Sequence, residues 1–192
     1  MNIEIVKAEI TASIKLKTAL LEDNVLMSKV VNLADRCVIS LNSGGKIIFC
    51  GNGGSFADAQ HLSAEFTSRF LFDRPGLASI ALGTNSSALS AIGNDYGYES
   101  VFAREIESIG KHTDMLIAIT TSGNSVNILK ALEAAKEVSV PAVVLTGAGR
   151  GMLDDATETL NIPSTDTAKI QECHIMIGHI ICGMVEAAIF QI

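Results

Sequence analysis

Apolar residues recur at helical spacing through the first forty residues of the chain. Residues 3–21 and 25–42 both carry apolar positions three or four apart, and the second stretch ends at the polar sequence NSGG. A broad apolar stripe of this kind is typical of a helix that packs one face against other elements. We therefore expect two N-terminal helices, which we predict to fold as a helical hairpin.

After residue 44 the pattern changes to short apolar runs separated by helical segments. The runs are 46–50, 78–82, 115–120, 142–147 and 158–163, and the expected helices are 55–70, 86–93, 98–109, 124–138 and 167–190. Four runs are apolar almost throughout, as parallel strands covered on both faces should be, and the weaker fifth suits an edge. The alternation predicts an α/β fold with a five-stranded parallel sheet flanked by helices.

Two of the predicted strands end in sequences rich in Gly, Ser, Thr and Asn. These are GNGGS (51–55) after the first strand and TTSGNS (120–125) after the third, and both lead directly into helices. Ligands of open α/β sheets bind at the carboxyl ends of strands, beside a topological switch point. Phe56 stands where the dinucleotide fingerprint G-x-G-x-x-G needs glycine, and no lysine follows as in a P-loop. We therefore expect no nucleotide cofactor.

The second loop has the chemistry of a phosphate site without a basic residue. Thr121, Ser122 and Ser125 supply hydroxyls around Gly123, at the start of a predicted helix. Helix N-termini offer unpaired N–H groups and a positive dipole end to anions, although Ser and Asn at such positions also simply cap helices. Because two such loops occur at corresponding strand ends, a phosphate site is the favoured interpretation.

Three titratable side chains are candidates for chemistry. His61 and Glu65 are four residues apart on one helix face, and His179 lies in an apolar stretch about two turns after Gln171 and Glu172. By spacing alone, Glu172 is the closer angular match to His179. The set fits proton abstraction next to the carbonyl of a sugar phosphate. It fits equally a zinc-type site formed by the two histidines and Glu65.

Composition narrows the class of partner. The net charge is -7 and no cluster of Lys or Arg is present, which argues against nucleic-acid binding. With 48% hydrophobic and 18% charged residues, we expect extensive subunit contacts. The four cysteines are scattered, with no C-x-x-C pair, as is typical of buried, reduced thiols in a cytoplasmic protein. His112 and His174 are interpreted as structural residues.

Neither end of the chain is predicted to enter a membrane. The first 24 residues mix charges through their apolar positions, so they do not resemble a signal peptide. The apolar segment 175–190 is short for a membrane span and contains His179 and Glu186. We expect this segment to be a helix buried between helices or subunits.

Four segments together carry a family resemblance that covers essentially the whole chain. Residues 44–66, 87–97, 119–132 and 170–186 resemble the phosphoheptose isomerases of the sugar isomerase (SIS) domain superfamily. The resemblance implies one SIS domain over 1–192, in which 1–43 form N-terminal helices used in oligomerisation and 44–192 form the α/β core. It also implies a cytoplasmic homotetramer with active sites at subunit interfaces.

The implied activity is an aldose–ketose isomerisation through an enediol. The substrate would be sedoheptulose 7-phosphate and the product D-glycero-D-manno-heptose 7-phosphate, the first step toward the heptose of lipopolysaccharide. By this resemblance Glu65 is the general base and His179 its partner acid/base, and one zinc per subunit is held by His61, Glu65, Gln171 and His179. The implied substrate contacts are Asn52, Gly53, Gly54, Ser55, Glu65, Asn94, Asp95, Thr120, Thr121, Ser122, Ser125 and Gln171.

The chain departs from the family pattern at four positions. Thr120 replaces a usual Ser, Lys169 stands where Arg is common, Ala168 stands where some members have Asp, and Phe56 is bulkier than usual. The rival interpretations are a non-catalytic SIS protein that binds the replication initiator and an isomerase of another sugar phosphate. Relatives of the first kind lose the catalytic carboxylate and histidine, whereas this chain keeps both.

Overall fold

The computed structural model describes residues 2–155 and 157–191 and has the alternating order that the sequence predicts. The strands are β1 (Ile47–Gly51), β2 (Ser79–Ala81), β3 (Met115–Ile119), β4 (Ala142–Thr146) and β5 (Thr159–Asn161). The helices are α1 (Ile3–Glu22), α2 (Asn24–Asn42), α3 (Gly54–Thr67), α4 (Ser86–Tyr96), α5 (Val101–Ile109), α6 (Val126–Glu137) and α7 (Thr167–Phe190). A short 3-10 helix, η1 (Tyr98–Ser100), precedes α5.

The five strands form one parallel sheet in the order β2-β1-β3-β4-β5. The fifth strand lies at an edge, as its weaker apolar character predicts. The strand order reverses between β1 and β3, so this is the topological switch point of the sheet. The loops that follow these two strands, GNGGS and TTSGNS, therefore lie side by side. This confirms the prediction that they lie at corresponding strand ends of one parallel sheet.

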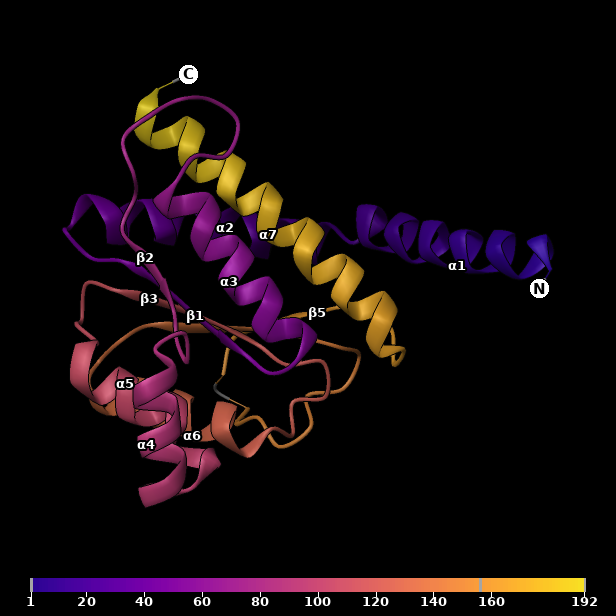
Figure 1. Cartoon of the computed structure of the whole chain (residues 1–192). Helices are drawn as coiled ribbons and strands as arrows, with labels where there is room; N and C mark the ends of the chain where they lie inside the picture. The colour runs from indigo at the N-terminus through magenta and orange to yellow at the C-terminus, as the bar shows by residue number, and fades with distance from the viewer. Residues whose placement is uncertain (1, 156, 192) are drawn as a thin grey trace.

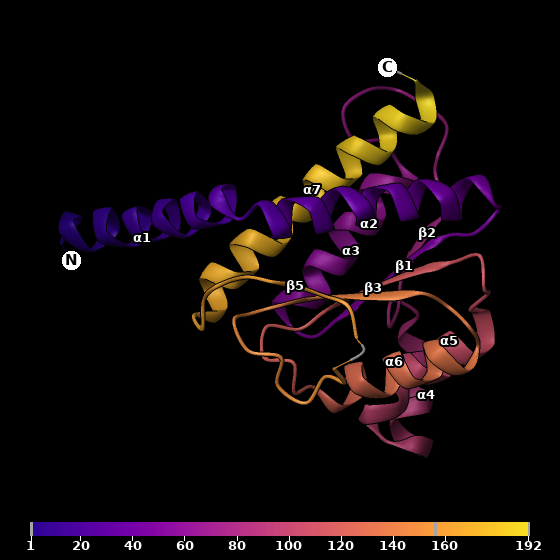
Figure 2. The same ribbon diagram turned by 180° about the vertical axis from the view of Figure 1, so that it is seen from behind.

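Helices cover both faces of the sheet, and two apolar cores result. On one face α2, α3 and α7 pack over strand residues such as Phe49, Ile117 and Leu145; on the other, α5 and α6 pack over residues such as Ile48 and Leu116. Figures 1 and 2 show these layers above and below the sheet. Both strand faces are apolar because both are buried, which explains the nearly continuous apolar runs.

The two N-terminal helices do not form the predicted hairpin. In Figures 1 and 2, α1 runs outward from the body instead of back along α2. Only Asp23 separates the helices, and its side chain caps α2 by accepting a hydrogen bond from the N–H of Leu26 at 2.9 Å. An αα-hairpin needs a loop of about 2–5 residues, so this junction is too short for the chain to reverse.

The C-terminal helix α7 is the apolar helix that the sequence places between other helices. It is long and apolar enough to cross a membrane, a test that the core helix of a globular protein also passes. Its buried residues include His174 and the ion-paired Glu186, and it packs on α2 and α3. All four cysteines of the chain are buried and free, as predicted.

His174 gives the fold a specific sensitivity to acid. The side chain is fully buried, and its Nε2 lies 3.3 Å from the carbonyl oxygen of Thr146 at the end of β4. Burial lowers the pKa of His174 to about 4, so the unfolded chain binds a proton more readily than the folded one. Stability is therefore lost as pH falls from the unfolded pKa, about 6.5, toward the folded value.

We expect the wild-type chain to lose about 3 kcal/mol of unfolding free energy from this group between pH 7 and pH 4. Urea unfolding at pH 7, 5 and 4, at fixed protein concentration, measures the loss. The His174→Gln variant keeps a neutral donor and should lose less over the same range. Equal losses in the two proteins would show that His174 does not titrate in this way.

Candidate functional site at the sheet edge and the α3–α7 interface

The turn after β1 is built so that α3 begins with free backbone donors. A Cβ atom on Gly51 would lie 2.4 Å from the carbonyl oxygen of Ser55, so only glycine permits this close turn. Gly53 has φ +56° and stands at the N-cap of α3 without any side-chain cap. Within GNGGS, Ser55 is buried, whereas Gly53 and Gly54 are exposed. The start of α3 therefore presents backbone N–H groups to a ligand.

The turn after β3 is held by its own hydroxyls and by a neighbouring loop. Thr120 is buried, and its Oγ1 accepts a hydrogen bond from the N–H of Gly123 and lies 3.4 Å from Oγ of Ser125. Gly123 has φ +70°, and a Cβ there would lie 2.2 Å from the carbonyl oxygen of Arg150. Ser122 is exposed and Thr121 is half-buried, so hydroxyl groups remain available at the rim.

The helix N-termini near this edge differ in whether a side chain caps them. Neither α3 nor α6 has a side-chain cap, although Ser125 occupies the N-cap of α6. In α7, by contrast, the Asp166 carboxylate accepts hydrogen bonds from the N–H groups of Ala168 and Lys169. Because a carboxylate already occupies the start of α7, the positive ends of α3 and α6 are the ones free to hold a phosphate.

A polar network that the sequence did not reveal fixes Asn52. Asn52 and Asn127 exchange two side-chain hydrogen bonds, at 2.8 and 2.9 Å, and the Tyr98 hydroxyl donates to Oδ1 of Asn52 at 3.1 Å. Asn127 is buried in the first turn of α6. In the sequence it is a polar residue among apolar neighbours, and this pattern was the signal that could have identified it. The network joins the loop after β1 to both α6 and η1.

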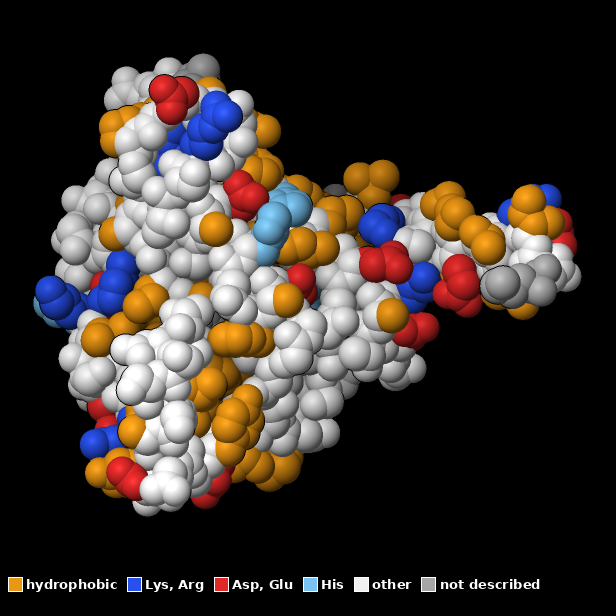
Figure 3. Space-filling view, in the orientation of Figure 1, with side chains coloured by type: hydrophobic (Ala, Val, Ile, Leu, Met, Phe, Trp, Pro, Cys, Tyr) orange, Lys and Arg blue, Asp and Glu red, His pale blue; other side chains and the backbone are white. Residues whose placement is uncertain are grey.

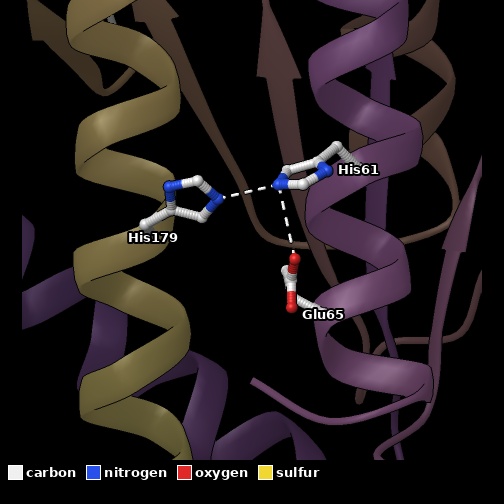
Figure 4. A group of neighbouring side chains, drawn as sticks. All are labelled: His61, Glu65 and His179. Atoms are coloured by element: carbon white, nitrogen blue, oxygen red, sulfur yellow. Dashed lines mark hydrogen bonds and ion pairs between the residues drawn. The ribbon is translucent and has the colours of Figure 1, made fainter. Parts of the chain in front are cut away.

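His61, Glu65 and His179 converge at the surface between α3 and α7. The Nε2 atoms of the two histidines are 2.8 Å apart, and Nε2 of His61 lies 3.3 Å from Oε1 of Glu65 (Figure 4). One potential ligand atom from each residue lies within 4.8 Å of the others. Figure 3 shows histidine side chains exposed where the two helices lie side by side. The structure thus brings together the three titratable residues that the sequence singled out.

The donor set of this cluster fits a tetrahedral metal ion. Two histidine nitrogens at about 2.0–2.1 Å from zinc, with a tetrahedral angle between them, are about 3.3 Å apart. Two of the observed spacings, 2.8 Å between the histidine nitrogens and 3.3 Å between His61 and Glu65, are close to this value, and all three ligand atoms lie within 4.8 Å of one another. The cluster therefore offers three potential ligand atoms, one from each side chain, of the types that zinc binds in proteins.

A second carboxylate, Asp58, lies beside the cluster and escaped the sequence analysis. It stands one turn before His61 on α3 and is half-buried, and its Oδ2 is buried without a hydrogen-bond partner. Burial raises the pKa of Asp58, while the charges of His61 and His179 act to lower it. The i−3 spacing from His61 was the signal that could have identified it.

Gln171 and Glu172 do not join the histidine cluster within this chain. Gln171 lies eight residues before His179, about 12 Å along the axis of α7, and its amide packs over Gly54 at the start of α3. Glu172, the closer match by spacing, instead contacts α1, where it accepts hydrogen bonds from Ser13 and Lys17. Those bonds and one from Lys169 lower the pKa of Glu172 to about 2.

Asn94 and Asp95 lie on the exposed C-terminal part of α4. The Asn94 amide donates to the Asp95 carboxylate at 2.7 Å, and both side chains face solvent. Tyr98, three residues after Asp95, is bonded to Asn52, so this segment borders the loop after β1. The segment is on the opposite face of the sheet from α3 and α7 (Figure 1).

Comparisons with known proteins identify the family. Residues 12–147 match the SIS domain family, and the chain belongs to it. Within that family the chain is similar to the phosphoheptose isomerase of Aneurinibacillus thermoaerophilus, with 51% identity over 187 residues that cover 97% of this chain and 94% of the relative. It is also similar to phosphoheptose isomerase 2 of Campylobacter jejuni, with 48% identity and coverage of 96% and 92%.

Solved structures agree. The phosphoheptose isomerase of Neisseria gonorrhoeae is 41% identical, with a TM-score of 0.87 and coverage of 96% of this chain and 98% of that one. The phosphoheptose isomerase of Francisella tularensis is 33% identical, with a TM-score of 0.89 and coverage of 97% of this chain and 99% of that one. The likeness therefore extends over essentially the full length of these chains.

Proposed function

We propose that this chain is an aldose–ketose isomerase that converts sedoheptulose 7-phosphate to D-glycero-D-manno-heptose 7-phosphate, the first step toward the heptose of lipopolysaccharide. The observation that carries the proposal is the convergence of Glu65, His61 and His179 on one side of α3, whose N-terminus is uncapped. The full-length similarity to phosphoheptose isomerases supports it.

The spacing along α3 suits a long sugar phosphate. His61 lies seven residues after Gly54, so the cluster is about 10 Å along the helix from the uncapped N-terminus. A seven-carbon chain with phosphate at one end and a carbonyl at the other has its two reactive ends well separated. The phosphate would lie on the loop 120–125 and the start of α6, with GNGGS and Gln171 along the sugar.

Glu65 and His179 have the chemistry that the isomerisation needs. Glu65 removes a proton from the carbon next to the carbonyl, and protonation of the carbonyl oxygen then gives a cis-enediol. The proton returns to the neighbouring carbon, while His179 exchanges protons at the oxygens or assists ring opening. Only the position of the carbonyl changes, so atoms and electrons balance without a redox partner.

A zinc ion, one per subunit, is part of the proposal. His61, Glu65 and His179 would hold it, with Gln171 as the fourth ligand that the resemblance implies. When bound, such an ion polarises a carbonyl or hydroxyl oxygen of the substrate as a Lewis acid. Because Gln171 packs over Gly54, about 12 Å along α7 from His179, its participation needs a contribution from another subunit.

We further propose that the chain acts as a cytoplasmic homotetramer. Ile3, Val6, Ile10 and Ile14 recur at helical spacing along α1, and each is more than half exposed, an apolar stripe that a partner helix would cover (Figure 3). Because α1 projects from the body instead of folding back along α2, this stripe is accessible to other subunits. Light scattering on the purified protein measures the mass, and a monomeric mass would exclude the tetramer.

Incubation with sedoheptulose 7-phosphate, with zinc or with a chelator, tests the function. We expect NMR of the sugar to show formation of the aldose in zinc and a loss of activity after chelation. Conversion that is unaffected by chelation would remove zinc from the proposal but leave the isomerase. If neither condition gives product, while a pentose or hexosamine phosphate does, the substrate is wrong. No turnover of any sugar phosphate would favour a binding protein for the replication initiator.

A further inference from the structure

The loop between α3 and β2, residues 68–78, is anchored by a buried ion pair. Nε of Arg74 lies 2.8 Å from Oε1 of Glu186 on α7, and both side chains are almost fully buried. The same carboxylate accepts hydrogen bonds from the N–H groups of Phe70 and Leu71, at 3.0 and 2.8 Å. Glu186 therefore fixes the loop backbone at Phe70, the residue whose ring contacts His179.

The guanidinium of Arg74 ties the same loop to the end of α3. Its Nη2 donates to the carbonyl oxygen of Glu65 at 2.7 Å, and its Nη1 donates to the carbonyl oxygen of Phe66 at 2.7 Å. Arg74 thus satisfies C-terminal carbonyls of the helix that carries the site, which have no partner within the helix. These contacts hold the loop against the end of α3.

Phe70 is the side chain that this anchored loop brings to the site. Its ring stacks on the His179 imidazole, with 5.4 Å between the ring centroids and an interplanar angle of 19°. The His61 ring meets His179 edge-on, at 5.0 Å and 72°. In the described part of the chain, Nδ1 of His179 makes no hydrogen bond. The plane of the imidazole is therefore set by Phe70 and by the contact with His61.

The α7 surface leaves room for the Phe70 ring. Gly183 lies one turn after His179, and a Cβ atom there would be 3.4 Å from the Phe70 ring. Phe72, on the same loop, faces another way and contacts Phe190 edge-on near the end of α7. The chain therefore contains a second loop phenylalanine whose ring packs on α7 away from the site.

We propose that Phe70 is a positioning residue for His179, held in place by the Arg74–Glu186 pair. Metal-binding histidines usually have their ring orientation fixed by a hydrogen bond from the second nitrogen, and loss of such a support lowers metal affinity or activity about 10–100-fold. Here the stacked phenyl ring takes over that role and aims Nε2 at His61. This inference rests on the proposed function, because it assigns Phe70 a role in that site.

The test compares Phe70→Leu with the matched control Phe72→Leu. Both remove one aromatic ring from the loop, so their melting temperatures should fall similarly. Phe70→Leu should lower kcat on sedoheptulose 7-phosphate about tenfold, with KM changed less than twofold, and should weaken zinc binding about tenfold in competition with a chromophoric chelator. Phe72→Leu should change neither kcat nor zinc affinity. Phe70→Tyr, which keeps the aromatic ring, should retain the wild-type values of both.

The outcomes separate the inference from the function on which it rests. If Phe70→Leu matches Phe72→Leu in both kcat and zinc affinity, Phe70 only fills space and the inference is overturned. An inactive wild-type enzyme would overturn the proposed function. The comparison of zinc affinities between Phe70→Leu and Phe72→Leu would still decide the role of Phe70. A wild type that neither turns over nor binds zinc would overturn both.

Discussion

Glu65→Gln is expected to lower kcat for the isomerisation by about 10²–10⁴-fold, since an amide cannot accept the proton that the carboxylate removes. The side chain is largely buried and close to His61, so the nearly isosteric amide should leave the helix and the assembly intact. Steady-state kinetics with sedoheptulose 7-phosphate measure the loss. The elution volume in size exclusion should match that of the wild type.

Glu107→Gln is the matched control for this change. Glu107 lies on α5 in an exposed pair with Arg104, far from the cluster in the fold. The same chemical substitution there should leave turnover within about twofold, because exposed ion pairs contribute little. His179→Ala should also reduce turnover by orders of magnitude. Near-wild-type activity of Glu65→Gln would remove Glu65 from the mechanism and leave His61 and His179 as a binding site only.

The sequence predicts the parts of the site that depend on strand ends. GNGGS and TTSGNS could be placed together because buried parallel strands read as apolar runs and both loops follow such runs. The pairing of His61 with Glu65 also follows from a local rule, the i,i+4 spacing of a helix. These inferences need no knowledge of which distant elements touch.

The contacts that could not be predicted from the sequence depend on which distant elements pack against each residue. Spacing places Glu172 and His179 on nearly the same side of α7, yet α1 crosses the start of this helix and binds Glu172, while α3 lies beside His179. An angle about a helix axis does not say which element occupies that direction. Phe70 was missed for a related reason, since a phenylalanine in an irregular loop carries no periodicity that would assign it to a site.

The direction of α1 is a similar case. Both helices were predicted within one residue of their observed ends, but the hairpin was wrong, because the single intervening residue does not allow a reversal. Among the residues that the structure describes, none covers the exposed apolar stripe of α1. The low charge content of the sequence therefore reflects surface as well as core, which is the physical reason to expect other subunits.

Glu186→Gln is expected to lower the free energy of unfolding by about 3–5 kcal/mol at pH 7, because it leaves the Arg74 guanidinium buried without its charged partner. Both side chains are almost fully buried, with exposures of 2% and 1%. The amide also presents N–H groups where the N–H donors of Phe70 and Leu71 need an acceptor. Urea unfolding at fixed protein concentration measures the difference. Glu107→Gln, in an exposed pair, should cost less than about 1 kcal/mol.

The pH dependence of this difference identifies the carboxylate as its source. Burial opposes ionisation, but hydrogen bonds from Leu71, Phe70 and Arg74 outweigh it and hold the pKa of Glu186 below its ordinary value. A group with a depressed folded pKa stabilises above the unfolded value, about 4.3, and this stability is lost as pH falls through the folded pKa. The gap between wild type and Glu186→Gln should therefore narrow below about pH 4. A gap that stays constant down to pH 3 would mean that lost packing, not the buried charge, destabilises the variant.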